Sequence, residues 1–98
     1  MAQFRVYRLP GGPLVLDLQS DLIATPTRVV APLLPPDGAA PAFTRLEPVF
    51  EIGGERLALH TGELAAVPAK LLAGPPVADL SARGYEIRGA LDMLFSGF

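Results

Sequence analysis

Few residues of this chain have the types and spacing needed for catalysis or metal binding. The single histidine, His60, lies in an apparent strand, and one imidazole cannot form a metal site alone. Ser20 and Asp21 are adjacent, but no histidine stands near them to activate the hydroxyl, so we interpret them as the polar start of a loop. The absence of cysteine removes disulfides, thiolate ligands and thiol catalysis. The sequence therefore predicts no catalytic residue, no metal and no cofactor.

Composition and charge favour partner binding over nucleic-acid binding. Half of the 98 residues are hydrophobic and 18% are charged, which leaves apolar surface for a partner to cover. Eight basic against ten acidic residues give a net charge of −2, without a cluster of lysine or arginine. Because a nucleic-acid surface needs positive charge for phosphates, we expect no direct nucleic-acid binding. We expect instead an oligomer or a tight protein complex.

No segment of the sequence is typical of a membrane span or a secretion signal. The longest unbroken apolar run, residues 29–36, has eight residues and includes three prolines. A spanning helix needs about 20 apolar residues. The first ten residues mix charged and apolar side chains and contain no continuous apolar stretch. We therefore expect no membrane association and a cytoplasmic location.

Two apolar residues stand in a segment otherwise typical of a loop. Residues 20–26 have turn-forming residues at both ends around Leu22 and Ile23. These side chains either fold beneath the loop into the core or form a contact patch for a partner. The terminal Phe98 raises the same two possibilities, because an aromatic ring at the end of a rigid helix suits an interface. The pattern leaves both open.

The elements that must position these residues are mostly strands. Residues 4–9 and 14–20 alternate in side-chain character on either side of a Pro-Gly-Gly-Pro turn, which predicts a first hairpin. Residues 28–34 are also typical of a strand. Because Pro32 lacks an N–H, we expect this strand to lie at a sheet edge or to contain a bulge.

The following segments predict a second hairpin between two irregular stretches. Residues 35–41 are rich in proline and should form a surface loop. Strands at 46–52 and 55–61 are joined by a Gly-Gly pair, which supplies the positive φ angles that a tight hairpin requires. Residues 62–74 contain a proline and should be a mixture of short turns and strand.

Near the end of the chain the apolar period becomes that of a helix. Apolar residues spaced by three, four, seven and eight form one stripe, namely Ile87, Ala90, Leu91, Leu94 and Phe95. The opposite, solvent-facing side holds Arg88, Asp92 and Ser96. Ser81 or Asp79 is expected to cap the helix N-terminus, and Gly97 to end the helix. The chain is thus predicted to be mainly β, a single domain over residues 1–98, with one C-terminal helix.

Several segments carry a family resemblance when they are taken together and in order. They are QFRVY at 3–7, DLQSDLIATP at 17–26, Ile52-Gly53, Val67-Pro68, VADLS at 77–81 and ALDMLFSGF at 90–98. Each is weak alone, but LQSDLIATP combined with a terminal Phe-x-Gly-hydrophobic ending is specific. With these segments the chain resembles the CcdB family of plasmid-addiction toxins over essentially its whole length.

The resemblance implies a fold, partners and a binding surface. The fold would be an SH3-like antiparallel barrel with a small side sheet and a C-terminal helix, assembled as a homodimer. Toxins of this family are not enzymes: they bind the A subunit of DNA gyrase and trap the cleaved DNA complex. The disordered C-terminal arm of a CcdA-like antitoxin neutralises them by folding onto the toxin. The gyrase-binding positions correspond here to Leu22, Ile23, Asp92, Ser96, Gly97 and Phe98.

The end of this chain departs from the Trp-Gly-Ile ending of the family. Ser96 stands at the tryptophan position, Asp92 at a position that is usually asparagine, and Phe98 in place of isoleucine. Loss of a buried indole from an interface costs about 3 to 5 kcal/mol. An alternative interpretation is therefore a diverged CcdB-like protein that binds its antitoxin but no longer poisons gyrase.

A third interpretation is an endoribonuclease, because the same barrel also serves the MazF-type mRNA interferases. The net charge of −2, the few arginines and the single histidine argue against it. RNA cleavage that is abolished by Arg28→Ala or His60→Ala would support it.

Overall fold

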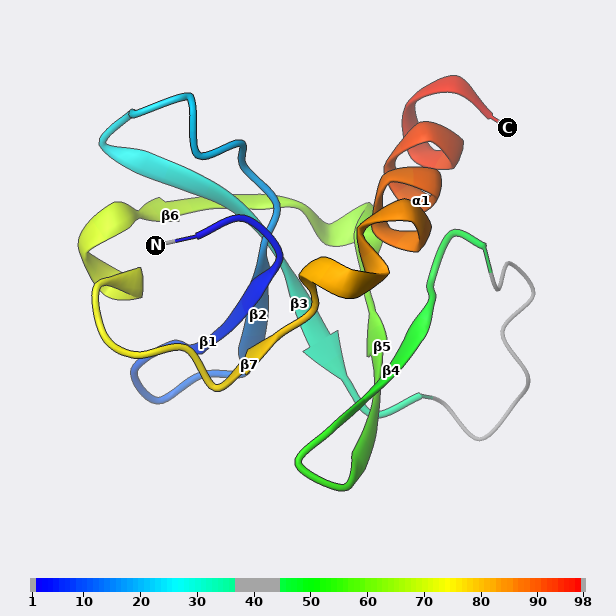
Figure 1. Ribbon diagram of the computed structural model, residues 1–98, viewed down its shortest axis with the longest axis horizontal. Helices are drawn as coiled ribbons and strands as arrows, with labels where there is room; N and C mark the ends of the chain where they lie inside the picture. Colours follow the sequence, from blue (N-terminus) through cyan, green and yellow to red (C-terminus); the bar gives the residue numbers. More distant parts are fainter. Residues whose placement is uncertain (1, 37–44, 98) are drawn as a thin grey trace.

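A curled antiparallel sheet and a C-terminal helix make up the computed structural model, which describes residues 2–36 and 45–97 (Figure 1). The strands and the helix are β1 (Arg5–Arg8), β2 (Leu14–Asp17), β3 (Thr27–Leu34), β4 (Val49–Ile52), β5 (Glu55–Leu59), β6 (Ala65–Pro68), β7 (Ala78–Asp79) and α1 (Gly84–Ser96). The predicted mainly β fold with a terminal helix is confirmed. Most of the predicted loop at 35–41 lies outside the described residues.

The sheet is organised around β3. Its strand order is β4-β5-β3-β2-β1-β7, and β6 also pairs with β3. One side of β3 pairs with β2, while on the other side its first half pairs with β6 and its last residues pair with β5. This change of partner accompanies the bending of the sheet into a nearly closed barrel (Figure 1). The expected SH3-like barrel is confirmed.

Of the two alternatives predicted for the strand that contains Pro32, a sheet edge or a bulge, the sheet edge is wrong, because β3 is paired on both sides. The Pro32 carbonyl accepts a hydrogen bond of 2.9 Å from the His60 N–H. In an antiparallel strand the N–H and C=O of one residue point to the same side. The N–H that proline lacks would therefore face the place where β3 changes partner from β6 to β5. The ladder is interrupted there, so the proline is accommodated.

The β4–β5 hairpin forms where it was predicted. Ile52 pairs with Glu55, and the intervening Gly53 and Gly54 have φ angles of 61° and 83°. A two-residue turn of this kind needs positive φ at both positions, and glycine adopts it without steric cost. The predicted mixture of turns and strand after this hairpin is also confirmed, as 3-10 helices Thr61–Glu63 and Ala69–Leu72 on either side of β6.

Buried side chains lie on both faces of the first three strands. The main cluster fills the barrel and includes Phe4, Val6, Leu14, Leu16, Leu18, Ala31, Leu33, Phe50, Leu59 and Ile87. The smaller cluster consists of Tyr7, Val15, Val30 and Leu72. Because side chains alternate between faces along a strand, β2 contributes to both clusters. The alternation predicted the face of Leu14, Leu16 and Leu18, but not that Asp17 on the other face would also be buried.

The helix begins later than predicted and lacks a side-chain N-cap. Its first residue is Gly84, after the 3-10 helix Ser81–Arg83, and the residue at its N-cap position makes no capping hydrogen bond through its side chain. Asp79 accepts a hydrogen bond of 2.8 Å from the Ser81 N–H, so its carboxylate stabilises the turn that enters the 3-10 helix rather than the start of α1. A Cβ at Gly84 would lie 3.1 Å from the Phe4 ring, so glycine lets the helix start this close to the barrel.

One side of α1 packs on the main cluster, as its apolar stripe predicted. Ile87 and Ala90 are fully buried, Leu91 packs against the cluster and Leu94 is half-buried. Phe95 is 71% exposed, so its predicted place in the core stripe is wrong. The last turns of α1 extend away from the sheet (Figure 1), which explains why the stripe loses its cover there.

Candidate functional site

The residues predicted to form a binding surface lie in two places on the chain. Leu22 and Ile23 are on the loop between β2 and β3, whereas Asp92, Ser96 and Gly97 belong to the C-terminal end of α1. Phe98 lies outside the described residues. In Figure 1 the loop and the end of the helix are at separate corners of the molecule. A single chain therefore does not join them into one surface.

Leu22 and Ile23 point away from the core. The Leu22 side chain is 92% exposed and that of Ile23 is 55% exposed. Of the two possibilities for this pair, the one in which both side chains fold into the core is wrong. Two adjacent apolar side chains held in solvent are suited to contact with a partner, since their burial would contribute about 25 cal/mol per Å² of apolar surface.

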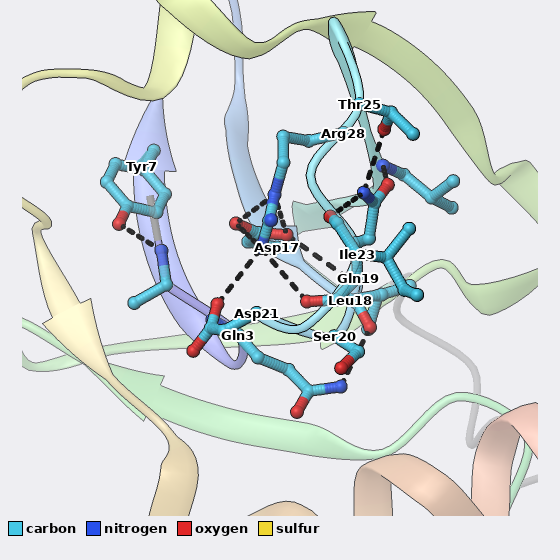
Figure 2. A network of polar contacts seen from close by, with 12 residues as sticks. Gln3, Tyr7, Asp17, Leu18, Gln19, Ser20, Asp21, Ile23, Thr25 and Arg28 are labelled. Atoms are coloured by element: carbon cyan, nitrogen blue, oxygen red, sulfur yellow. Dashed lines mark hydrogen bonds and ion pairs between the residues drawn. The ribbon is translucent and has the colours of Figure 1, made fainter.

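A network of hydrogen bonds determines the shape of the Leu22–Ile23 loop (Figure 2). The Gln19 Nε2 group donates to the Ile23 carbonyl at 2.8 Å and to Thr25 Oγ1 at 2.9 Å. Its Oε1 atom accepts from the Val29 N–H at 3.1 Å. Ser20 Oγ accepts from the Leu22 N–H, so the serine hydroxyl stabilises the turn at the start of the loop.

Behind the loop lies an ion pair between Asp17 and Arg28. Their side chains are 0% and 6% exposed, and Arg28 Nη2 is 2.9 Å from Asp17 Oδ2. Arg28 Nε also donates to both carboxylate oxygens, at 3.2 and 3.0 Å. Burial raises the pKa of the Asp17 carboxyl, and the hydrogen bonds from Arg28 oppose this shift. Asp17 stands between two leucines and Arg28 directly precedes two valines, and that is the signal by which their burial and pairing could have been suspected.

The C-terminal end of α1 carries the second group of predicted residues. Gly97 has a φ of 81° and donates its N–H to the Met93 carbonyl at 2.9 Å, so it ends the helix as predicted. Asp92 and Ser96 are exposed and lie one helical turn apart. The exposed ring of Phe95 is next to Ser96 in sequence, and the sequence had not predicted it as part of a binding surface.

A shallow groove of about 460 Å³ adjoins this part of the helix. Its lining includes Arg45, Pro48, Tyr85, Arg88, Gly89 and Asp92. The groove therefore lies between the outer face of α1 and the segment before β4. It brings Asp92 to the same surface as Arg45 and Arg88, a convergence that the scattered arginines did not predict.

The polar groups that resembled catalytic candidates are in structural contacts. His60 Nδ1 lies 2.7 Å from Glu63 Oε2 and 4.0 Å from Glu47 Oε2, which ties the end of β5 to its flanking segments. Within residues 2–36 and 45–97, no group of three or more histidine, cysteine, aspartate or glutamate side chains is placed to hold a metal ion. Over the same residues, no helix is long and apolar enough to cross a membrane.

A small barrel with exposed apolar side chains on a hydrogen-bonded loop and at a helix end has the kind of surface by which proteins contact other proteins. Comparison with known families makes this specific. Residues 3–97, nearly the whole chain, match the family described as CcdB protein, so the chain belongs to the CcdB family. It is thus a member of a family of toxin–antitoxin toxins that poison gyrase and are not catalytic enzymes.

Proposed function

We propose that this protein is the toxin of a type II toxin–antitoxin pair. It binds the A subunit of DNA gyrase, traps the cleaved gyrase–DNA complex and is neutralised by a CcdA-like antitoxin. The observation that carries this proposal is the match of residues 3–97 to the CcdB family. The outward apolar side chains of Leu22 and Ile23 support it, because the resemblance assigns gyrase contact to these positions.

The proposed gyrase surface consists of Leu22, Ile23, Asp92, Ser96, Gly97 and Phe98. We propose that the chain is a single domain, acts in the cytoplasm and forms a homodimer. The separation of the loop from the helix end within one chain supports a homodimer, since a second copy offers a way to complete the surface (Figure 1). The exposed Phe95 ring is a further apolar group for such an interface.

The first experiment measures binding of a purified gyrase A fragment to the wild type and to Ser96→Trp. We expect Ser96→Trp to bind more tightly, because the indole restores an aromatic contact at an exposed position of the helix end. Ser81→Trp, another exposed serine outside the proposed surface, is the control and should leave binding unchanged. If the wild type and Ser96→Trp both fail to bind, gyrase is not the target.

A diverged member that retains the fold and antitoxin binding is the second candidate, and Ser96 favours it because a hydroxyl replaces the expected indole. Induced expression separates the two functions. Growth arrest that is relieved by a mutation in the gyrase A interface supports the poison. Harmless expression together with tight antitoxin binding supports the diverged member.

The structure adds no support for the ribonuclease interpretation. Arg28 is buried against Asp17 and shapes the Leu22–Ile23 loop, and His60 contacts Glu63. An assay for RNA cleavage by the purified protein remains its direct test.

A further inference from the structure

The loop at residues 20–26 combines exposed apolar side chains with polar side chains that are hydrogen-bonded within the protein. Its apolar Leu22 and Ile23 side chains point into solvent. Two of its polar side chains hydrogen-bond to the nearby backbone: Ser20 Oγ accepts from the Leu22 N–H, and the Thr25 hydroxyl donates to the Thr27 carbonyl of β3 at 2.6 Å. Exposed loops ordinarily place polar groups outward, where water satisfies them. These hydrogen bonds indicate that the polar groups stabilise the conformation of the loop, while the apolar groups stay free for contact.

We propose that Gln19 and Arg28 are positioning residues that hold residues 20–26 in one conformation and thereby keep Leu22 and Ile23 ready for a protein partner. The inference rests on the proposed function, because the partner that would use this ordered loop is the gyrase A subunit. Neither residue is proposed to touch the partner.

Gln19 connects three points that are distant along the loop. Its amide nitrogen reaches the Ile23 carbonyl and the Thr25 hydroxyl, and its amide oxygen reaches the Val29 N–H at the far side, with all three distances between 2.8 and 3.1 Å (Figure 2). One side chain thus replaces the backbone pairing that a short hairpin would use. No apolar side chain of similar length can make these three bonds.

Arg28 connects the loop to the core. Its Nη2 group lies 2.9 Å from the Gln19 carbonyl and 3.3 Å from Asp21 Oδ1, while the same guanidinium is held by the buried carboxylate of Asp17. Asp17 Oδ1 also accepts from the Gln19 N–H at 3.2 Å, which turns the chain out of β2. The planar guanidinium has several donors in fixed directions, and lysine cannot reproduce this arrangement.

The N-terminal segment adds a further contact to the same loop. The Gln3 N–H donates to Asp21 Oδ1 at 2.9 Å, so Asp21 accepts from both Gln3 and Arg28. A loop fixed at this many points has already lost the conformational freedom that binding would otherwise remove. Affinity gained in this way comes from ordering before contact, without any added contact area.

The test measures the order of the loop separately from partner binding. Hydrogen–deuterium exchange of the full-length protein is followed at residues 20–26 in the wild type, Gln19→Met and Arg28→Lys. We expect exchange in this segment to be faster by about tenfold in both variants, since each hydrogen bond lost contributes a factor of about three to ten. Hydrogen exchange in β2 and β5 should not change in Gln19→Met, because replacing an uncharged side chain leaves no buried charge unpaired.

Matched controls are available for each variant. Gln3→Met removes a side-chain hydrogen bond of 3.2 Å to the Leu18 carbonyl, which lies outside residues 20–26, and it keeps the backbone N–H that donates to Asp21. Arg56→Met removes an exposed arginine from β5. Both controls should exchange like the wild type in the loop.

Binding of the gyrase A fragment to the same variants completes the experiment. If Gln19→Met loosens the loop, we expect its affinity to fall by about tenfold, which is the cost of ordering a few residues on binding. Unchanged exchange in residues 20–26, or faster exchange without any change in affinity, would overturn the positioning role. Failure of the wild type to bind gyrase A would refute the proposed function instead, and the exchange data would still decide whether Gln19 and Arg28 order the loop.

Discussion

At the scale of single residues, the buried pair of Asp17 and Arg28 has the largest influence on the candidate site. The guanidinium is fixed on one side by a carboxylate that solvent does not reach, and on the other side it bonds to the loop. A buried ion pair often gives little net stability, because desolvation of the two charges offsets their attraction. Its role here is better explained by orientation, because a guanidinium bonded through both Nε and Nη2 has few alternative positions.

Removing only one member of this pair should destabilise the fold strongly. Arg28→Met leaves the Asp17 carboxylate buried without its partner, which we expect to cost about 3 to 5 kcal/mol in urea unfolding at pH 7. The double variant Asp17→Asn with Arg28→Met has no unpaired buried charge, so its free energy of unfolding should fall by less. Arg56→Met, which removes an exposed arginine, should stay within about 0.5 kcal/mol of the wild type.

The defect of Arg28→Met should also depend on pH. Burial raises the pKa of Asp17, and without Arg28 only the hydrogen bond from the Gln19 N–H still opposes that shift. The folded variant then binds a proton more tightly than its unfolded state does, so its stability relative to the double variant increases as the pH falls from 7 towards the unfolded value near 3.8. If the difference in unfolding free energy between the single and double variants stays constant over this pH range, the unpaired Asp17 carboxylate is not the cause of the destabilisation.

At the scale of elements, the sequence predicted the features that neighbouring residues determine and missed those that depend on residues far along the chain. The Gly53-Gly54 hairpin follows from a turn rule that involves only neighbouring residues, and it formed as predicted. Pro32 was misplaced because whether a strand is at an edge depends on β5 and β6, which come much later in the chain. Phe95 continues the helical stripe of Ile87, but the periodicity does not reveal where the supporting sheet ends.

The candidate site shows the same division between local and distant causes. The turn-forming residues that flank Leu22 and Ile23 predicted a loop, and the structure shows both side chains outside the core. The sequence could not choose between that arrangement and a core position, because the choice depends on Arg28, which fixes the loop from β3. Periodicity in the sequence does not reveal such a contact, because the spacing of these residues matches neither a helical nor a strand period.

The helix end allows a test at the scale of one element. Gly97 adopts a left-handed conformation with φ of 81°, which a residue with a Cβ adopts only at a cost. We expect Gly97→Ala to lower the free energy of unfolding by about 1 kcal/mol, which corresponds to a fall in Tm of about 4 to 8 °C for a domain of this size. Thermal unfolding followed by circular dichroism measures this change.

Gly62→Ala provides the comparison for the helix end. Gly62 does not have a positive φ, and a Cβ there would meet nothing within 4 Å. This replacement should leave Tm nearly unchanged. Equal effects of the two substitutions would mean that the left-handed end of α1 is not what Gly97 contributes.

At the scale of the whole molecule, the exposed apolar residues suggest how a complete surface forms. Leu22 and Ile23 lie on one part of the barrel, and Phe95 lies on the projecting end of α1 (Figure 1). A two-fold homodimer would use the same patch from both copies, so the Phe95 rings of both copies would be buried in the interface. The proposed homodimer therefore gives a reason why a ring that belongs to the core stripe by sequence is left uncovered in the single chain.

Replacing this ring should weaken the proposed dimer. Each Phe95 ring buried between copies contributes about 2 kcal/mol, and symmetry doubles the loss in Phe95→Ser. Sedimentation equilibrium should give the wild type twice the 10.3 kDa chain mass and should shift Phe95→Ser towards the monomer at the same concentration. Tyr85→Ser is the matched control, because Tyr85 is a 90% exposed ring on the same helix that lines the groove near Arg45. A monomeric wild type would contradict the homodimer, and equal weakening by both substitutions would show that the interface does not depend on Phe95 in particular.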